Sequence, residues 1–253
     1  MRTELQKASL WKRFAAWMLD GILVCILAVG VAYVLASVLG YDAYNQKLDA
    51  AYEQYETQYG IKFDIGQEAY EKLSPQEKQK YDDAYQALIA DQEAMHAYQM
   101  VMNLTLVIVS IGLLLTVLLL EFAVPLLLKN GQTVGKKVFG LGLMHREGIR
   151  INTVQLFARA LLGKYTIELM IPVYILLMVF WGTMGVMGTA VMLILLVAQV
   201  VSMAVTRTNS ALHDLLANTV VVELSSQWIF ESREALIEYQ KQQHAKAAAE
   251  QPY

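Results

Sequence analysis

The stretch from Ile22 to Leu39 contains no charged residue, and this uninterrupted apolar run constrains the fold more than any other feature of the chain. A membrane-spanning helix needs about 20 mostly apolar residues. With the apolar residues from Phe14 onward, the run is long enough to cross a bilayer. It is also longer than the apolar core of a secretory signal peptide, and no small-residue cleavage site follows it. We therefore expect a retained first span over about 14–39.

Three further apolar stretches, at about 101–128, 161–180 and 186–205, repeat this pattern. The composition agrees, because only 17% of the residues are charged, whereas soluble domains average about 25%. A net charge of −3 argues against nucleic acid as a main partner. The single cysteine, Cys25, excludes an intrachain disulfide and a cysteine-based metal site. We expect an all-α membrane protein with four transmembrane helices, embedded in a lipid bilayer.

The segment 41–99, between the first two predicted spans, has the composition of a water-exposed insert. Residues 42–93 hold 12 acidic residues and 5 lysines, a net charge of −7, and the segment is rich in tyrosine. Tyrosines at three- and four-residue steps predict two amphipathic helices, with a capping box at 74–77 opening the second. We expect a helical hairpin that turns at 60–66 and whose second helix can run straight into the second span. The tyrosines are interpreted as packing between these helices or, alternatively, as a docking surface.

Residues 129–164 carry the opposite charge, with seven basic residues against one acidic residue, a net charge of +6. Short loops rich in lysine and arginine stay in the cytoplasm, so we expect cytoplasmic termini and an extracytoplasmic acidic insert. Anionic lipid headgroups are the expected partner of this basic loop. Its glycine-rich part, 131–137, lacks the spacing of a phosphate-binding loop. Segments 138–145 and 149–151 predict a small β-hairpin, and 219–224 has strand character and can pair with the first of them.

Seven charged residues in or beside the predicted spans are the candidate binding residues: Arg13, Asp20, Glu121, Arg159, Glu168, Arg207 and Asp214. An acid near hydrocarbon is costly unless it finds a partner or water. Asp20 follows Arg13 by seven residues, which places both on one helix face, about 10 Å apart along the axis. Arg207 and Asp214 repeat this spacing. The repeat indicates either a weak internal duplication or the general gathering of positive residues at cytoplasmic helix ends.

The order of these motifs resembles the RDD family of bacterial membrane proteins, which is named for one arginine and two aspartates. By position these correspond to Arg13, Asp20 and Asp214. The other matching elements are Gly131-Gln132-Thr133-Val134-Gly135-Lys136-Lys137 with Gly140, Gly148, Arg159, and His213 with Ala217, Thr219 and Val221. The resemblance covers about 8–40 and 100–224. It implies a multi-pass protein of the bacterial inner membrane, in a family where transport is suspected and some members are linked to sodium/proton exchange.

Two functions from different classes fit these observations. In the first, the protein is a cation- or proton-coupled transporter in which Asp20 or Glu121 alternates between proton and cation, tuned by an arginine. Four spans are few for alternating access, so this function requires a homodimer. In the second, it is a non-transport assembly or signalling module whose Arg/Asp pairs latch the amphipathic 207–224 segment to the first span.

An enzyme is not expected, because the four histidines are scattered and the sequence holds no catalytic motif such as HExxH or GxSxG. We therefore predict no catalytic residue, no metal and no cofactor. The chain is divided into 1–40, the N-terminus and first span; 41–99, the insert; 100–224, the core with three spans and the basic loop; and 225–253, a cytoplasmic tail.

Overall fold

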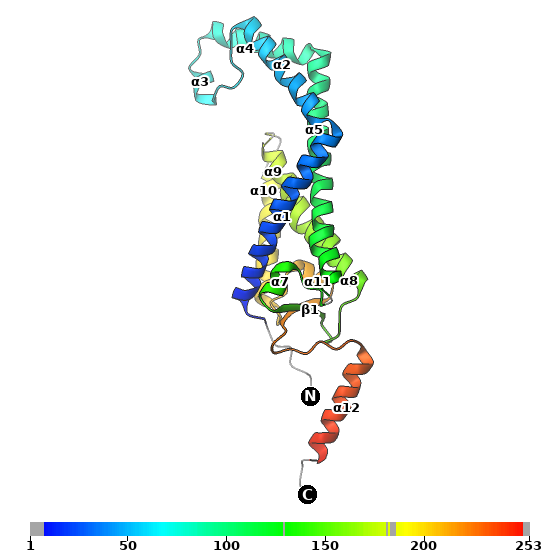
Figure 1. The fold of residues 1–253 in the computed structure, drawn as a ribbon. Coiled ribbons are helices and arrows are strands. Elements are labelled where there is room, and N and C mark those ends of the chain that lie inside the picture. The colour runs from blue at the N-terminus through cyan, green and yellow to red at the C-terminus, as the bar shows by residue number, and fades with distance from the viewer. Residues whose placement is uncertain (1–7, 129, 181, 183–185, 250–253) are drawn as a thin grey trace. The chain divides into compact units, whose positions relative to one another are not determined.

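The structure is a computed structural model that describes residues 8–128, 130–180, 182 and 186–249. Lys129 of the basic segment and the end of the predicted tail lie outside the described residues. Figure 1 shows a largely helical chain with two short strands. Among the described residues, four helical stretches are long and apolar enough to cross a membrane: Leu10–Leu39, Gln92–Leu127, Thr153–Val179 and Met187–Val205. The prediction of a helical membrane protein with four spans and a small strand element is confirmed.

The first and fourth spans are single α-helices, α1 (Leu10–Leu39) and α10 (Val186–Val205). The second and third spans change helix type along their length. The second consists of α5 (Gln92–Val117), the π-helical η1 (Leu118–Ala123) and α6 (Val124–Leu127). The third consists of α8 (Thr153–Ala158), the π-helical η2 (Arg159–Met170) and α9 (Ile171–Phe180). π-Helical turns are rare and frequently lie at functional sites, which directs attention to the charged residues of η1 and η2.

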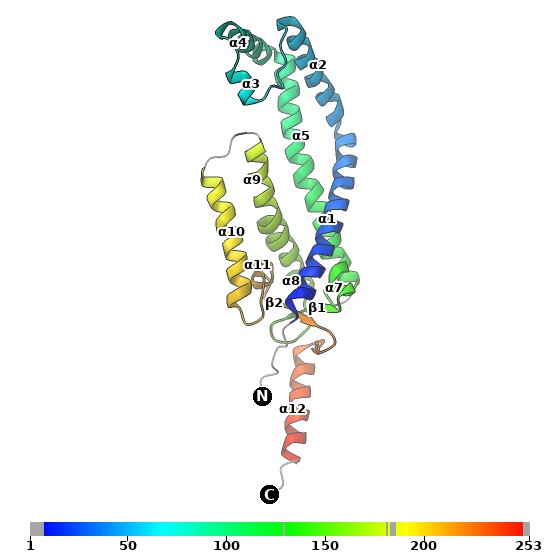
Figure 2. The same cartoon turned by 90° about the vertical axis from the view of Figure 1, so that its left-hand side faces the viewer.

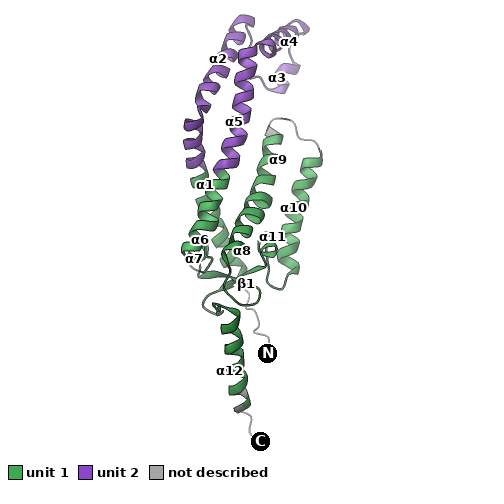
Figure 3. Cartoon of the chain, turned by 90° about the vertical axis from the view of Figure 1, so that its right-hand side faces the viewer, with its two compact units in different colours: residues 1–28, 113–253 green, residues 29–112 purple. Residues whose placement is uncertain are grey.

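The chain divides into two compact units, 29–112 and the combination of 1–28 with 113–253 (Figure 3). The smaller unit holds the acidic insert, which forms α2 (Tyr41–Tyr59), α3 (Gln67–Glu71) and α4 (Pro75–Ala90). In this unit α2 packs against α4. Ser74 caps α4 through the expected capping box with Glu77. Tyrosines contribute to the packing, as in the edge-to-face contact of Tyr52 with Phe63 at 5.5 Å between ring centroids.

The expectation that the second insert helix runs unbroken into the second span is wrong. The chain leaves the helical conformation at Asp91, which has φ −73° and ψ 113°. The Asp91 carboxylate accepts hydrogen bonds from the backbone N–H groups of Glu93 and Ala94, at 2.8 and 3.2 Å. An aspartate at this position caps the helix that follows, so α4 ends at Ala90 and α5 begins as a separate helix.

The larger unit contains a two-stranded antiparallel sheet of β1 (Leu141–His145) and β2 (Thr219–Glu223), with Leu141 opposite Glu223. The predicted hairpin of 138–145 with 149–151 forms only in a minimal form: an isolated antiparallel bridge joins Met144 to Arg150, and the backbone N–H of His145 donates a 2.9 Å hydrogen bond to the carbonyl oxygen of Ile149. The longer pairing is the one predicted with 219–224, because the buried valines of β2 offer β1 an apolar partner.

Three short helices of the larger unit lie beside this sheet, near the end where α1 begins (Figure 2). Here lie α7 (Val134–Val138), α8 and α11 (Leu212–Leu216). The apolar core joins Ala16 of α1 to Leu141, Leu143, Leu156 and Val221. The helix α12 (Arg233–Ala249) follows within the predicted tail. The sheet and its short helices therefore place the glycine-rich segment and the His213-Asp214 pair beside the span ends.

Candidate functional site

Charged side chains from the first three spans and from the short helices α7 and α11 form a buried network in the larger unit. Six of them are less than 9% exposed: Asp20, Glu121, Lys136, Arg159, His213 and Asp214. Three more are partly buried: Arg13, Lys164 and Glu168. Buried charges in proteins need partners, because removing an ion from water is expensive. The partners of each acid therefore define what this network can do.

Asp214, at 0% exposure, lies at the centre of the network. Its Oδ1 is 3.0 Å from Nε of Arg159, and its Oδ2 is 3.3 Å from Nη2 of Arg13. Burial by itself would raise the pKa of Asp214, but the neighbouring His213, Arg159 and Arg13 outweigh burial and hold that pKa well below its ordinary value. Asp214 is therefore a carboxylate in the resting network, shared between the first span and the third.

Arg13 does not pair with Asp20, although both lie on α1. Its Nη1 donates hydrogen bonds to the backbone carbonyl oxygens of Thr208 and Asn209, at 3.1 and 2.6 Å. Together with the ion pair to Asp214, these bonds fasten the start of the first span to the loop after the fourth span. The arrangement matches the contact that a latch between the first span and the 207–224 segment requires.

Asp20 is instead held by the glycine-rich segment. Its carboxylate accepts hydrogen bonds from Oγ1 of Thr133 at 2.5 Å and from the backbone N–H of Gly135 at 2.7 Å, and Nζ of Lys136 lies 4.0 Å away. A side chain at Gly135 would collide with the carbonyl oxygen of Ala16 and reach within 2.9 Å of the Asp20 carboxylate. The glycine is required because the backbone of α7 approaches α1 this closely. The segment that resembles a phosphate loop only by composition thus binds a carboxylate of its own chain.

Glu121, on η1, faces two cations of η2. One of its carboxylate oxygens forms a close ion pair with Nζ of Lys164, and the other, Oε2, lies 3.7 Å from Nη1 of Arg159. Neither Glu121 Oε2 nor Arg159 Nη1 has a hydrogen-bond partner among the described residues, although both atoms are buried. Buried polar atoms of this kind are normally satisfied by protein or by ordered water. Glu121 Oε2 and Arg159 Nη1 can therefore each form one further hydrogen bond, for example with water.

Glu168 links the network to the fourth span through Gln199. Its Oε1 lies 2.5 Å from Nδ1 of His213, and the other ring nitrogen of His213 is 3.4 Å from Oδ1 of Asp214. Gln199, the strongly polar residue of α10, reaches Glu168 at 3.4 Å and accepts a hydrogen bond from the backbone N–H of Leu212. His213 therefore bridges two carboxylates from different elements.

The structure brings six of the seven sequence-predicted residues into this network and leaves one outside. Arg207 is exposed and forms no ion pair with the described residues. The equal spacing of Arg207–Asp214 and Arg13–Asp20 is consequently not matched by equal contacts: Asp214 pairs with arginines of two other segments. The spacing argument for an internal duplication gains no support from this geometry.

The sequence interpretation missed the lysines. Lys136 and Lys164 were assigned to loop topology and lipid contact, yet both point into the network. The sequence did contain a signal for these lysines. Residues 129–164 carry a surplus of positive charge, and the four acids in or beside the spans outnumber the candidate arginines that could balance them. With the lysines included, four acids (Asp20, Glu121, Glu168 and Asp214) meet four cations (Arg13, Lys136, Arg159 and Lys164), so the network is neutral when His213 is neutral.

Protonation near neutral pH changes this balance. Burial, followed by the positive charges of Arg159 and Lys164, lowers the pKa of Lys136 to about 7. Burial also lowers the pKa of His213. With a pKa of about 7, Lys136 changes its charge around neutral pH. Within the described residues, no cluster of three or more histidine, cysteine or acidic side chains has the geometry to hold a metal ion.

Comparison with known proteins places this arrangement in a family. No curated protein and no solved structure matches the chain. A family model does match, over residues 7–218, and that stretch includes every member of the buried network. The matched range covers most of the chain, and the chain therefore belongs to the RDD family.

Proposed function

We propose that this membrane protein carries out cation- or proton-coupled transport and that the buried network is its charge-exchange site. The observation that carries the proposal is the Glu121–Arg159 pair, where two buried charged groups face each other at 3.7 Å with one unsatisfied atom each. Ionisable groups inside membrane spans are expensive and mark ion pathways and proton relays. Replacing buried ion pairs by apolar residues is often neutral or stabilising, so stability alone is a weak reason to keep so many.

In this proposal the exchanged charge binds at Glu121. Its carboxylate is attracted by Lys164 on one side and by Arg159 on the other. A proton or a small cation taken up at Oε2 cancels the negative charge and weakens both attractions. Arg159 then remains paired with Asp214 alone, at 3.0 Å. The loss of one contact between η1 and η2 couples binding to a change in how the second and third spans pack.

The assembly and the membrane side belong to the same proposal. Four spans offer little surface for alternating access, so we propose that two copies of the chain form the transporting unit. The basic segment 129–164 supports cytoplasmic termini, with the acidic insert on the outer side of a bacterial plasma membrane. The network is assigned no enzymatic role.

Ion-driven uptake into proteoliposomes tests the proposal. Asp20→Asn removes the charge that Lys136 faces but keeps the side-chain shape and one oxygen that can accept the hydrogen bond from the backbone N–H of Gly135. We expect at least a tenfold loss of flux. The matched control is Glu223→Gln, because Glu223 pairs with Lys12 at 2.6 Å outside the buried network. Equal flux in parent and Asp20→Asn removes Asp20 from the mechanism.

The second candidate function is an assembly or signalling module in which the charges are structural latches. The hydrogen bonds from Arg13 to the carbonyls of Thr208 and Asn209, together with its ion pair to Asp214, favour this candidate. They fix a loop that an ion pathway would not need to hold. A module of this kind predicts that network variants lose stability and partner capture together, while parent proteoliposomes show no ion-driven flux.

A further inference from the structure

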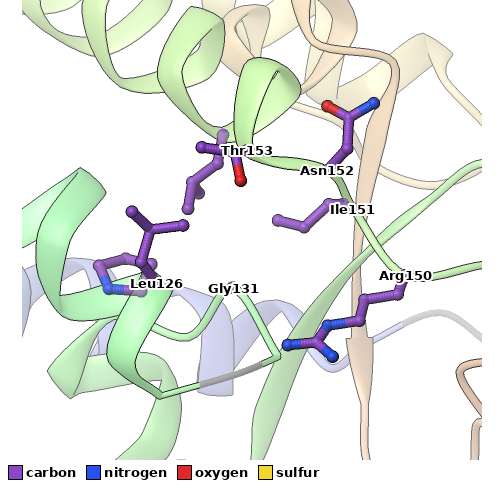
Figure 4. Close-up of a pocket in the computed structure, with 8 residues that line it drawn as sticks. Leu126, Gly131, Arg150, Ile151, Asn152 and Thr153 are labelled. Atoms are coloured by element: carbon purple, nitrogen blue, oxygen red, sulfur yellow. The ribbon is translucent and has the colours of Figure 1, made fainter. Parts of the chain in front are cut away.

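The larger unit holds a pocket that the buried network does not use. It has a volume of about 240 Å³ and lies between the end of the second span and the start of the third. Figure 4 shows its lining: Pro125, Leu126, Gly131, Arg150, Ile151, Asn152, Thr153 and Leu156. Apolar spans end where hydrocarbon gives way to headgroups, so a pocket between two span ends faces the lipid headgroup layer.

We propose that this pocket binds the phosphate headgroup of an anionic phospholipid. The lining combines the groups that such a ligand requires. Leu126, Ile151 and Leu156 supply apolar side chains, which suit the glycerol and the first acyl carbons. Arg150 supplies a guanidinium and Thr153 a hydroxyl group (Figure 4). A guanidinium binds a phosphate through two parallel N–H groups, which makes arginine the preferred phosphate ligand.

The backbone holds Arg150 in place for this role. Its N–H donates a 2.7 Å hydrogen bond to the carbonyl oxygen of Phe230, and the residue forms a β-bridge with Met144 of β1. From this anchored position the guanidinium extends towards the loop that carries Gly131 (Figure 4). Gly131 has φ +59°, and an added Cβ would come within 2.5 Å of Ile151, so the opposite wall is also closely fitted. The two sides of the pocket are thus set by the fold before any ligand arrives.

The distribution of charge argues for an anionic occupant. The buried network takes up Lys136, Arg159 and Lys164 from the basic segment and balances them with acids. Two further cations of that segment, Lys137 and Arg146, are exposed. The single acid of the segment, Glu147, faces Arg233 at 3.9 Å and offsets little of this surplus. An exposed positive surface at the membrane border attracts anionic lipids by about 1 kcal/mol per cation, which corresponds to about fivefold in affinity.

Native mass spectrometry of the full chain in detergent tests the proposal with three probes: phosphatidylglycerol, phosphatidylcholine and inorganic phosphate. We expect phosphatidylglycerol to bind at least about fivefold more tightly than phosphatidylcholine, and we expect Arg150→Gln to weaken it by about five- to tenfold. The control is Arg146→Gln, an exposed arginine of the same segment that does not line the pocket, and it should change binding by less than about twofold.

A second variant keeps the test decisive if Arg150→Gln does not fold. Leu126 is 42% exposed, so Leu126→Glu leaves the core intact and places a negative charge at the pocket wall. It should weaken phosphatidylglycerol binding by at least about tenfold. Equal binding of the two lipids, or an equal effect of Arg146→Gln and Arg150→Gln, would show only diffuse surface attraction and overturn the proposal. Full competition by inorganic phosphate would assign the pocket to the free anion and overturn the lipid assignment.

Discussion

Arg159 contacts both Asp214 and Glu121 in the buried network, and its replacement is the most informative perturbation that the structure offers. The side chain is 1% exposed and faces Asp214, at 0%, and Glu121, at 3%. Arg159→Met keeps most of the side-chain length but deletes the charge between two buried carboxylates. Removing one partner of a buried ion pair costs about 3–5 kcal/mol, because the remaining charge is left uncompensated. Arg13 and Lys164 still face one carboxylate each, so we expect a loss within this range rather than twice it.

The assay is the free energy of unfolding of the purified protein, measured by denaturant titration in mixed micelles. Arg207→Met is the matched control, because Arg207 is exposed and has no ion-pair partner among the described residues; its effect should stay within about 0.5 kcal/mol. Adding Asp214→Asn to Arg159→Met removes one of the stranded charges. The double variant should therefore be more stable than the sum of the single losses by about 0.5–3 kcal/mol. A loss below about 1 kcal/mol for Arg159→Met would refute the view that these carboxylates depend on Arg159.

Three further perturbations follow from the same contacts. Lys136 has a pKa of about 7 in the folded protein, well below its ordinary value of 10.5. Between these two pH values the unfolded chain binds more protons than the folded chain, so the free energy of unfolding rises with pH. Lys136→Met should abolish this rise in unfolding titrations from pH 7 to 10. Gly135→Ala should lower the free energy of unfolding by about 1–3 kcal/mol, because the added methyl group collides with α1. Gly21→Ala should not destabilise α1, because no atom lies within 4 Å of its added methyl group. Thermal unfolding of both variants tests this difference. The double exchange Arg13→Asp with Asp214→Arg should not restore the stability lost in the single variants, because Arg159 also pairs with the Asp214 carboxylate. A restored melting temperature would contradict this shared pairing.

Sequence patterns were sufficient for the elements whose formation depends on local chemistry. Long, mostly apolar runs predicted the four spans, because a bilayer requires length and apolarity and little else. The cap at Ser74 was also predictable, since a capping box involves residues only three positions apart. The break at Asp91 was missed, because a single acidic residue within a polar helical pattern does not by itself predict the end of a helix.

Long-range pairing was less predictable than local structure. The charged residues in the spans were recognised as costly, and the latch hypothesis tied 207–224 to the first span, but the partner of each acid was not predicted. In the folded chain Arg13 and Asp20 have different partners, because segments far away in sequence supply Asp214, Thr133 and Gly135. Both predicted strand pairings form, but their lengths were not predictable: 149–151 makes one bridge to β1, whereas β2 pairs with β1 along its whole length. Spacing constrains which face a residue occupies, whereas contacts depend on the tertiary fold.

The most direct test of the central claim is proton flux across liposomes that hold the parent protein or Glu121→Gln, followed with an internal pH-sensitive dye under an imposed cation gradient. Glutamine keeps the shape at the Glu121–Arg159 pair but cannot exchange a proton or bind a cation as a carboxylate does. If the network is a charge-exchange site, parent liposomes should show cation-dependent flux that Glu121→Gln reduces by at least tenfold while the protein remains folded. Equal flux in folded parent and Glu121→Gln, or no cation-dependent flux in the parent, would contradict it.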